Sequence, residues 1–265
     1  MCVSKKIRGF CIFLFDFIEK TIEFITFAPK MNNAVLYLFP TPIADNDLSY
    51  SIPAINLELL NQCDCFIVED LRSARRFLKK AGYKKDFDEV EFSLLNEHTK
   101  IEDIEYYLEP ISKGRNIGLM SEAGLPCIAD PGQMIVSMAH KKGVRVVPLV
   151  GASSLMMSLM ASGFNGQNFA FVGYLPVDRV ERVKRIKELE SIMLRFNQTQ
   201  IFIEAPYRNN QLLETLLSSL NPSSMLCVGV DISMESEQII SKSVSNWRKT
   251  KIDLNKRNSV FLIYS

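Results

Sequence analysis

The chain has 265 residues, and its 31 Lys and Arg residues nearly balance its 30 Asp and Glu residues, for a formal net charge of +1. This balance excludes a uniformly basic nucleic-acid-binding domain but leaves room for a local basic patch. Apolar residues make up 47% and charged residues 23%, which indicates a folded globular protein rather than a disordered one. The length allows one large domain or two domains of medium size.

The first thirty residues differ in character from those that follow. Residues 7–28 are rich in Phe and Ile, but the uninterrupted apolar run covers only Phe10–Phe15, and charged residues follow it from Asp16 onward. Such a run is too short and too interrupted for a membrane span, so no membrane partner is expected. Because Met31 directly precedes the first strand-like run, we interpret residues 1–30 as an N-terminal extension that a misassigned start would explain. An amphipathic interfacial helix is the alternative.

From residue 31 to residue 150, short β-rich runs alternate with helical stretches. We expect strands at 34–39, 65–68, 90–94, 117–120 and 144–148, and helices at 53–62, 71–81, 101–108 and 133–142. Gly82 and Pro110 are expected to end the second and third of these helices. The alternation predicts a mainly parallel, doubly wound sheet.

The pattern changes after residue 150. We expect helices at 154–161, 180–196 and 209–220, and strands at 169–174, 200–204, 225–230, 238–243 and 259–264. The last strands follow one another without long helices between them, which predicts a mixed sheet. The sequence thus predicts an α/β protein with two domains, residues 31–150 with a mainly parallel sheet and residues 151–265 with a mixed one.

The six cysteines form no CxxC pair, and the chain has only two histidines. This spacing does not match a zinc site, so no metal is expected. Cys63 and Cys65 lie in an apolar strand-like run, which predicts buried, reduced thiols. Reduced thiols are typical of a reducing compartment, and we expect a cytoplasmic protein.

Several common catalytic motifs are missing from the sequence, namely GxGxxG, GxxxxGK[ST], HExxH and GxSxG. Three loops rich in Pro, Gly and small residues remain, at 39–45, 121–132 and 148–154. Each follows an expected strand, and ligands of α/β sheets bind at the carboxyl ends of strands. These loops are therefore the candidate ligand-binding segments, with ordinary turns as the alternative reading.

The same loops are part of a longer series of motifs. In chain order the series is TPIAD (41–45), EDLR (69–72), NEH (96–98), SEAGLPCIADPG (121–132), PLVGASS (148–154), FAFVGYLP (169–176) and IFIEAPYR (201–208). By these motifs the chain resembles the tetrapyrrole (corrin/porphyrin) methylase superfamily, and most of all its branch of 16S ribosomal RNA cytidine 2′-O-methyltransferases. The resemblance covers residues 36–241. It departs from the family pattern at Glu122 and Leu125, which replace Asp and Thr, and at Val150 and Ala152, where prolines are usual.

The resemblance implies two α/β domains with S-adenosylmethionine bound in the cleft between them, a homodimer, and methyl transfer without a metal. It assigns cofactor binding to four parts of the chain: Pro42 in the first loop, Gly124, Leu125, Pro126 and Ile128 in the second, Ser153 and Ser154 in the third, and Glu204 with Ala205 at a later strand end.

A ribose hydroxyl is a weak nucleophile, so a general base would help its methylation. Glu122 and Asp130 flank the cofactor loop and are the favoured catalytic candidates, with Glu204 and His98 as further ones. For Asp130 the alternative is a helix N-cap ahead of Pro131.

One surface is a candidate for RNA binding. Arg72, Arg75, Arg76 and Lys79 recur at helical spacing, which places them on one helix face suited to phosphates. A solvated face with no partner is the alternative. Tyr207 and Arg208 could stack on and pair with a nucleotide, or could simply begin a helix.

The sequence therefore predicts an S-adenosylmethionine-dependent methyltransferase that modifies a ribose 2′-hydroxyl of small-subunit ribosomal RNA. Two alternatives stay open at this point. One is a methyltransferase that acts on a substrate other than RNA. The other is a non-catalytic protein of the same fold that binds S-adenosylmethionine.

Overall fold

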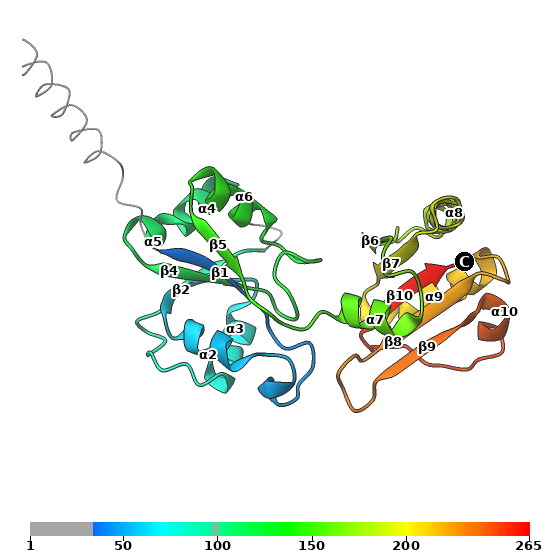
Figure 1. Cartoon of the computed structure of the whole chain (residues 1–265), viewed down its shortest axis with the longest axis horizontal. Helices are drawn as coiled ribbons and strands as arrows, with labels where there is room; N and C mark the ends of the chain where they lie inside the picture. Colours follow the sequence, from blue (N-terminus) through cyan, green and yellow to red (C-terminus); the bar gives the residue numbers. More distant parts are fainter. Residues whose placement is uncertain (1–33, 97–98, 100) are drawn as a thin grey trace, which may run out of the picture.

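A computed structural model of the chain describes residues 34–96, 99 and 101–265. The interpretation of residues 1–30 and the candidate base His98 fall outside the described residues. Within them, the strands belong to two sheets, each with its own helices (Figure 1).

The first sheet is parallel throughout, as the alternation of strands and helices predicts. Its strands stand in the order β3-β2-β4-β1-β5. They are β1 (Val35–Phe39), β2 (Cys63–Val68), β3 (Glu91–Leu94), β4 (Asn116–Met120) and β5 (Arg145–Pro148). The helices are α2 (Ala54–Leu60), α3 (Leu71–Lys80), α4 (Ile101–Tyr107), α5 (Glu109–Ser112) and α6 (Gln133–Lys141), with a 3-10 turn η1 at Leu48–Tyr50.

Helices cover both faces of this sheet, which is why its central strands are apolar on both sides. Phe77 and Leu78 of α3 pack with Phe66 on one face, whereas Ile104 of α4 and Ile135 of α6 pack with residues such as Leu36 on the other. The helices cover the faces of the sheet and not its edge. A ligand can therefore bind at the edge where the carboxyl ends of the parallel strands meet.

Cys63 and Cys65 are both buried, as expected, but they do not share a face. The pairing of β2 with β4 shifts register between them, so Cys63 packs in one core and Cys65 in the other. Burial raises the pKa of each thiol to about 12, which keeps both protonated and unreactive near neutral pH.

The second sheet is mixed, again as predicted. Its order is β6-β7-β10-β8-β9, with β6 and β7 parallel and the other pairs antiparallel. The strands are β6 (Phe169–Tyr174), β7 (Thr199–Ile203), β8 (Met225–Val230), β9 (Gln238–Ser243) and β10 (Ser259–Tyr264), and the helices are α7 (Ser154–Ser162), α8 (Arg179–Phe196), α9 (Asn209–Ser219) and α10 (Val244–Trp247), with a 3-10 turn η2 at Pro206–Arg208.

The two faces of the second sheet differ in what covers them. Leu189 of α8, Leu216 of α9 and Trp247 of α10 fill the core on one face. Leu155 and Leu159 of α7 pack on the other face. α7 directly follows the segment that links the two sheets, and it lies on the side of the second sheet that faces the first (Figure 1).

Two details differ from the sequence-based expectation. Pro110 does not end helical structure, because it lies in the first turn of the short helix α5, where its missing N–H costs nothing. The helix α10 was not expected, since four residues are too few to show a period. None of the described helices is long and apolar enough to cross a membrane. The division of the chain after residue 150 stays a prediction.

Candidate cofactor-binding site

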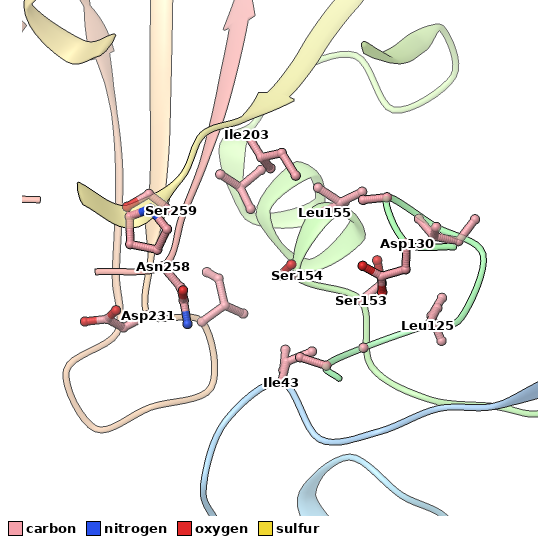
Figure 2. Close-up of a pocket in the computed structure, with 18 of the residues that line it drawn as sticks. Ile43, Leu125, Asp130, Ser153, Ser154, Leu155, Ile203, Asp231, Asn258 and Ser259 are labelled. Atoms are coloured by element: carbon pink, nitrogen blue, oxygen red, sulfur yellow. The ribbon is translucent and has the colours of Figure 1, made fainter. Parts of the chain in front are cut away.

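A cavity of about 260 Å³ lies between the two sheets, and the three loops singled out in the sequence reach it (Figure 2). We call it the central cavity. From the first sheet, Ile43 follows β1, the segment from Ala123 to Asp130 follows β4, and Ser153 and Ser154 follow β5. All three are carboxyl ends of parallel strands, which is where ligands of such sheets bind.

The second sheet supplies the other wall. Tyr174 ends β6, Glu204 directly follows β7, and Asp231 directly follows β8. Asn258 and Ser259 stand at the start of β10, and β10 is antiparallel to β7 and β8, so its start meets their ends at the same edge. Figure 2 shows Asp231, Asn258 and Ser259 on one side of the cavity, Leu125 and Asp130 on the other, and Ser153 and Ser154 between them.

The loop from Ser121 to Gly132 is held in place by Thr41. The Thr41 N–H donates to the Gly124 carbonyl at 2.9 Å, and the Gly124 N–H donates back to the Thr41 carbonyl at 3.1 Å. Gly124 has φ +85°, a conformation that favours glycine. Cys127 and Ala129 adopt φ +69° and +67°, so this loop also stores strain at two non-glycine positions.

The loop between β5 and α7, residues 149–153, is the linking loop, and it needs a glycine for a different reason. A Cβ added at Gly151 would lie 2.2 Å from Cβ of Pro40, so the loop after β5 can pass the loop after β1 only without a side chain there. Two residues later, the side chain of Ser153 accepts a hydrogen bond from the Met156 N–H and caps α7. The hydroxyl of Ser153 is therefore shared between helix capping and the cavity that it lines.

Glu204 is buried, and only one of its two carboxylate oxygens is satisfied. Oε1 accepts hydrogen bonds from the Ala205 N–H at 2.7 Å and from Nε and Nη2 of Arg208 at 2.9 and 2.6 Å. Oε2 is buried and has no partner among the described residues, and Glu204 lines the central cavity. A buried acceptor without a donor is costly, so this oxygen is suited to an amine, ammonium or hydroxyl of a ligand.

Carboxylates of neighbouring strand ends interact at the edge of the cavity. Burial raises the pKa of Asp130, and the negative charge of Glu122 raises it further. Burial and the charge of Asp130 likewise raise the pKa of Glu69, whose Oε2 accepts a hydrogen bond from the Glu122 N–H at 3.4 Å. A carboxylate with a raised pKa is a better proton acceptor, which keeps Asp130 a candidate base.

Among the expected site residues, some meet at this cavity and others do not. Gly124, Leu125, Ile128, Asp130, Ser153, Ser154 and Glu204 all line it. Pro42 and Glu122 line a neighbouring cavity instead. Pro126 is buried and Ala205 is half-buried; neither lines either cavity. The alternative reading of Asp130 as a helix cap is wrong, because Gly132 is the N-cap of α6, no side chain caps that helix, and the helix begins after Pro131 at Gln133.

The basic face of α3 forms as its spacing predicts. Arg72, Arg75, Arg76 and Lys79 are all exposed, opposite the buried face of α3. They are not equivalent, however. The Arg75 guanidinium lies over the rings of Phe87 and Phe92, 5.9 and 5.4 Å from their centroids, so it also packs locally. Tyr207 is exposed, and Arg208 lies over its ring while it holds Glu204.

Sequence reasoning missed Glu69 as an interacting carboxylate and Tyr174, Asp231 and Asn258 as cavity residues. The strand-end rule could have indicated Tyr174 and Asp231, since each stands at the end of an expected strand. Asn258 could not be found in that way, because it precedes its strand. Among the described residues, no group of three or more His, Cys, Asp or Glu side chains is placed to hold a metal ion.

The chain is similar to known methyltransferases over most of its length. It is 31% identical to the ribosomal RNA small subunit methyltransferase I of Haemophilus influenzae over 215 residues, 81% of this chain and 72% of the relative. It is 33% identical to the protein of the same name from Bacillus subtilis over 224 residues, 83% of this chain and 71% of the relative.

Solved structures share the fold at much lower identity. The methyltransferase CobJ aligns with a TM-score of 0.58 at 12% identity, over 88% of this chain and 94% of CobJ. Cobalt precorrin-4 methyltransferase CbiF aligns with a TM-score of 0.57 at 14% identity, over 90% of this chain and 98% of CbiF. Residues 51–246 match the family described as tetrapyrrole (corrin/porphyrin) methylases. With two sheets that meet at one cavity and a family match over most of its length, the chain belongs to the tetrapyrrole methylase family.

Proposed function

We propose that this chain is an S-adenosylmethionine-dependent methyltransferase that methylates a ribose 2′-hydroxyl in small-subunit ribosomal RNA. The observation that carries the proposal is the convergence of the family's loop motifs on the central cavity, in a chain that is 31–33% identical to relatives named for that RNA. We further propose that it acts in the cytoplasm and as a homodimer.

The residues of the central cavity fit S-adenosylmethionine. The unpartnered Oε2 of Glu204 needs a donor, and the cofactor offers an amino group, an ammonium group and ribose hydroxyls. Gly124 and Leu125 on one wall, and Ser153 and Ser154 on another, present backbone groups and small side chains that let a ligand approach closely. When bound, the cofactor supplies an electrophilic methyl group on a sulfonium sulfur.

The protein's own part in such a reaction is to align groups and to accept a proton. Holding a hydroxyl and a methyl group in line can lower a barrier by about 7–11 kcal/mol. Asp130 and Glu122, on adjacent parts of one loop, are the carboxylates placed to take the hydroxyl proton. The raised pKa of Asp130 favours that role, while Glu122 faces the neighbouring cavity.

The basic face of α3 supports an RNA substrate, because phosphate contacts dominate RNA affinity and exposed cations supply them. The two alternatives remain testable. A methyltransferase for another substrate would bind the cofactor but leave RNA unlabelled. A non-catalytic member of the fold would bind the cofactor and label nothing in a cell extract.

The experiment is a methyl-transfer assay with small ribosomal subunits and their RNA, taken from a strain that lacks the corresponding methyltransferase. Labelled methyl groups are followed into RNA, protein and small molecules, and the RNA is digested to nucleosides for mass spectrometry. A 2′-O-methylated nucleoside that depends on the chain supports the proposal. Label in protein or small molecules alone supports the first alternative, and no label at all supports the second.

A further inference from the structure

A second cavity, of about 320 Å³, adjoins the central one, and we call it the side cavity. Its walls are the segment Thr41–Asp45 after β1, one face of α3, and Ser121 with Glu122 after β4. Ile43 and Met234 line both cavities, so the two spaces abut at these side chains.

One short segment separates the two cavities. Ser121 and Glu122 line the side cavity, and Ala123, Gly124 and Leu125 line the central one. The paired backbone hydrogen bonds between Thr41 and Gly124 fix this partition. The Thr41 hydroxyl adds a third hydrogen bond, 3.3 Å to the Ser121 carbonyl. A group in the side cavity is thus separated from a ligand in the central cavity only by the segment from Ser121 to Leu125.

The second sheet closes the arrangement from the other side. Met234 belongs to the loop after β8, and the side chain of Asn46 donates to the Ser233 carbonyl at 2.9 Å. This bond ties the loop that carries Met234 to the loop that carries Ile43. The shared edge of the two cavities is therefore defined by both halves of the chain.

The polar groups of the side cavity suit a nucleotide. Arg76 and Lys80 stand one helical turn apart on α3 at its wall. Lys80 is held by Asp45 at 2.7 Å and by the Asn46 carbonyl at 2.8 Å, whereas Arg76 makes no hydrogen bond or ion pair with the described residues. The charge of Asp45 attracts Arg76 only weakly, so the guanidinium keeps its donors for a phosphate and its plane for stacking on a base.

The rest of the wall supplies what a base and a ribose need. Ala74 and Phe77 present apolar surface, Ser73 presents a hydroxyl, and Glu122 presents a carboxylate at the side nearest the central cavity. Neutral apolar surface next to a few placed polar groups is typical of small-ligand sites.

The geometry points to the side cavity as the subsite that receives one unstacked nucleotide of the RNA, with Arg76 on its phosphate or base and Glu122 facing its ribose. This inference rests on the proposed function, since it takes RNA to be the substrate. It goes beyond the basic face of α3, because it separates the cation that contacts the target nucleotide from the cations that hold flanking phosphates. Glu122 then lies on the substrate side of the loop and Asp130 on its cofactor side.

The test fills the cavity and, outside it, removes one hydrogen bond, between the Ser73 hydroxyl and the side chain of Asp70 at the start of α3. Ser73→Leu places a larger side chain on a helix that tolerates leucine, at a wall of the side cavity but not of the central one. Ser137→Leu, at an exposed position of α6, is the matched control. Calorimetry with S-adenosylhomocysteine shows that each variant is folded.

Two readouts are measured on the full chain. One is kcat/KM for methylation of small-subunit RNA, and the other is the Kd of a short single-stranded oligoribonucleotide in the presence of S-adenosylhomocysteine. We expect Ser73→Leu to lower kcat/KM by about tenfold or more and to weaken binding of the oligonucleotide, with S-adenosylhomocysteine binding unchanged. Ser137→Leu is expected to leave both at the wild-type values.

A second pair of variants changes charge at exposed positions of α3 and fills no cavity. Arg76→Gln and Lys79→Gln remove the same charge from the same helix, but only Arg76 lines the side cavity. Both are expected to weaken binding of long RNA to a similar degree, while Arg76→Gln alone lowers kcat at saturating RNA.

The inference is overturned if Ser73→Leu keeps the wild-type kcat/KM and oligonucleotide affinity while it binds S-adenosylhomocysteine normally. It is also overturned if Arg76→Gln and Lys79→Gln are equivalent in kcat. Failure of the proposed function looks different, because the wild-type chain itself would then methylate no small-subunit RNA. In that case a Kd for the oligonucleotide that still depends on Ser73 would support the subsite without the proposed reaction.

Discussion

Glu204 and Arg208 form an ion pair in which the carboxylate is buried and only one of its two oxygens is satisfied. Arg208 donates twice to Oε1, at 2.6 and 2.9 Å, while Oε2 stays buried and without a partner among the described residues. The hydrogen bond with Glu204 also raises the pKa of Arg208 above its usual value. Protein interiors seldom leave such an acceptor unused, which is why we assign Oε2 to a ligand.

Glu204→Gln should therefore weaken binding of S-adenosylhomocysteine by about tenfold, because the ligand loses a hydrogen bond to a charged acceptor. Glutamine keeps the size of the side chain and one carbonyl oxygen for Arg208 and Ala205. Glu214→Gln, at an exposed position of α9, is the matched control. The assignment fails if calorimetry gives the two variants the same Kd.

Gly151→Ala should disturb the two loops that meet behind the cavity. The added Cβ would lie 2.2 Å from Cβ and 2.5 Å from Cγ of Pro40, and a proline ring cannot move aside easily. We expect a loss of about 1–3 kcal/mol in the free energy of unfolding and weaker binding of S-adenosylhomocysteine. Gly166→Ala, where no atom lies within 4 Å of the new Cβ, should change neither quantity by a comparable amount. Equal denaturation curves for the two variants would contradict the packing described here.

Ala129→Gly should stabilise the chain. Ala129 is exposed and has φ +67°, a conformation that costs alanine more than glycine. We expect the free energy of unfolding to rise by about 0.5–1 kcal/mol in chemical denaturation. Ala123→Gly in the same loop, where φ is not positive, should instead lower it. A decrease in both variants would show that the loop is not strained at residue 129.

The buried carboxyl groups of Glu69 and Asp130 should make the protein less stable as the pH rises. In the folded protein both carboxyl groups have a raised pKa, mainly because of burial. At a pH between the unfolded and the folded pKa of such a group, the folded state therefore binds more protons than the unfolded state. Stability should then fall as pH rises from the unfolded pKa of about 4 through the folded pKa. Glu69→Gln removes the negative charge that the Glu69 carboxylate carries at high pH, so this variant should raise the Tm more at pH 8 than at pH 4. A Tm difference from the wild type that is the same at both pH values would contradict the interaction.

The basic face of α3 should account for part of the salt dependence of RNA binding. The double variant Arg72→Gln with Lys79→Gln avoids Arg75, which also packs on Phe87 and Phe92. Each lost contact with single-stranded RNA should reduce the slope of log K against log salt by about 0.7. Fluorescence titrations at several salt concentrations measure the slope. An unchanged slope would mean that this face is only solvated.

The sequence predicts the fold well because the signals are local. The continuous apolar runs at the end of β2 and along β10 indicate strands without any knowledge of their neighbours. Short elements such as α10 have too few residues for a period, and the place of Pro110 in the first turn of α5 depends on where α4 ends.

The candidate site is only partly accessible from the sequence, because it depends on which strands are neighbours. Glu69 interacts with Asp130 because β2 lies beside β4, and no local pattern gives that order. Asn258 reaches the cavity because β10 is antiparallel to β8. The division of one loop into a side-cavity part with Glu122 and a central-cavity part with Gly124 likewise appears only once Thr41 is seen to pair with it.

Calorimetric titration of the full chain with S-adenosylhomocysteine is the most direct test of the claim that the central cavity binds the cofactor. We predict binding at one site per chain with a Kd of roughly 1 μM, about −8 kcal/mol, and loss of affinity in Glu204→Gln. No heat of binding and no rise in Tm at millimolar ligand would contradict the claim. The strained loop at Cys127 and Ala129, and the linking loop that lacks the family's prolines, would then be the first places to look for the cause.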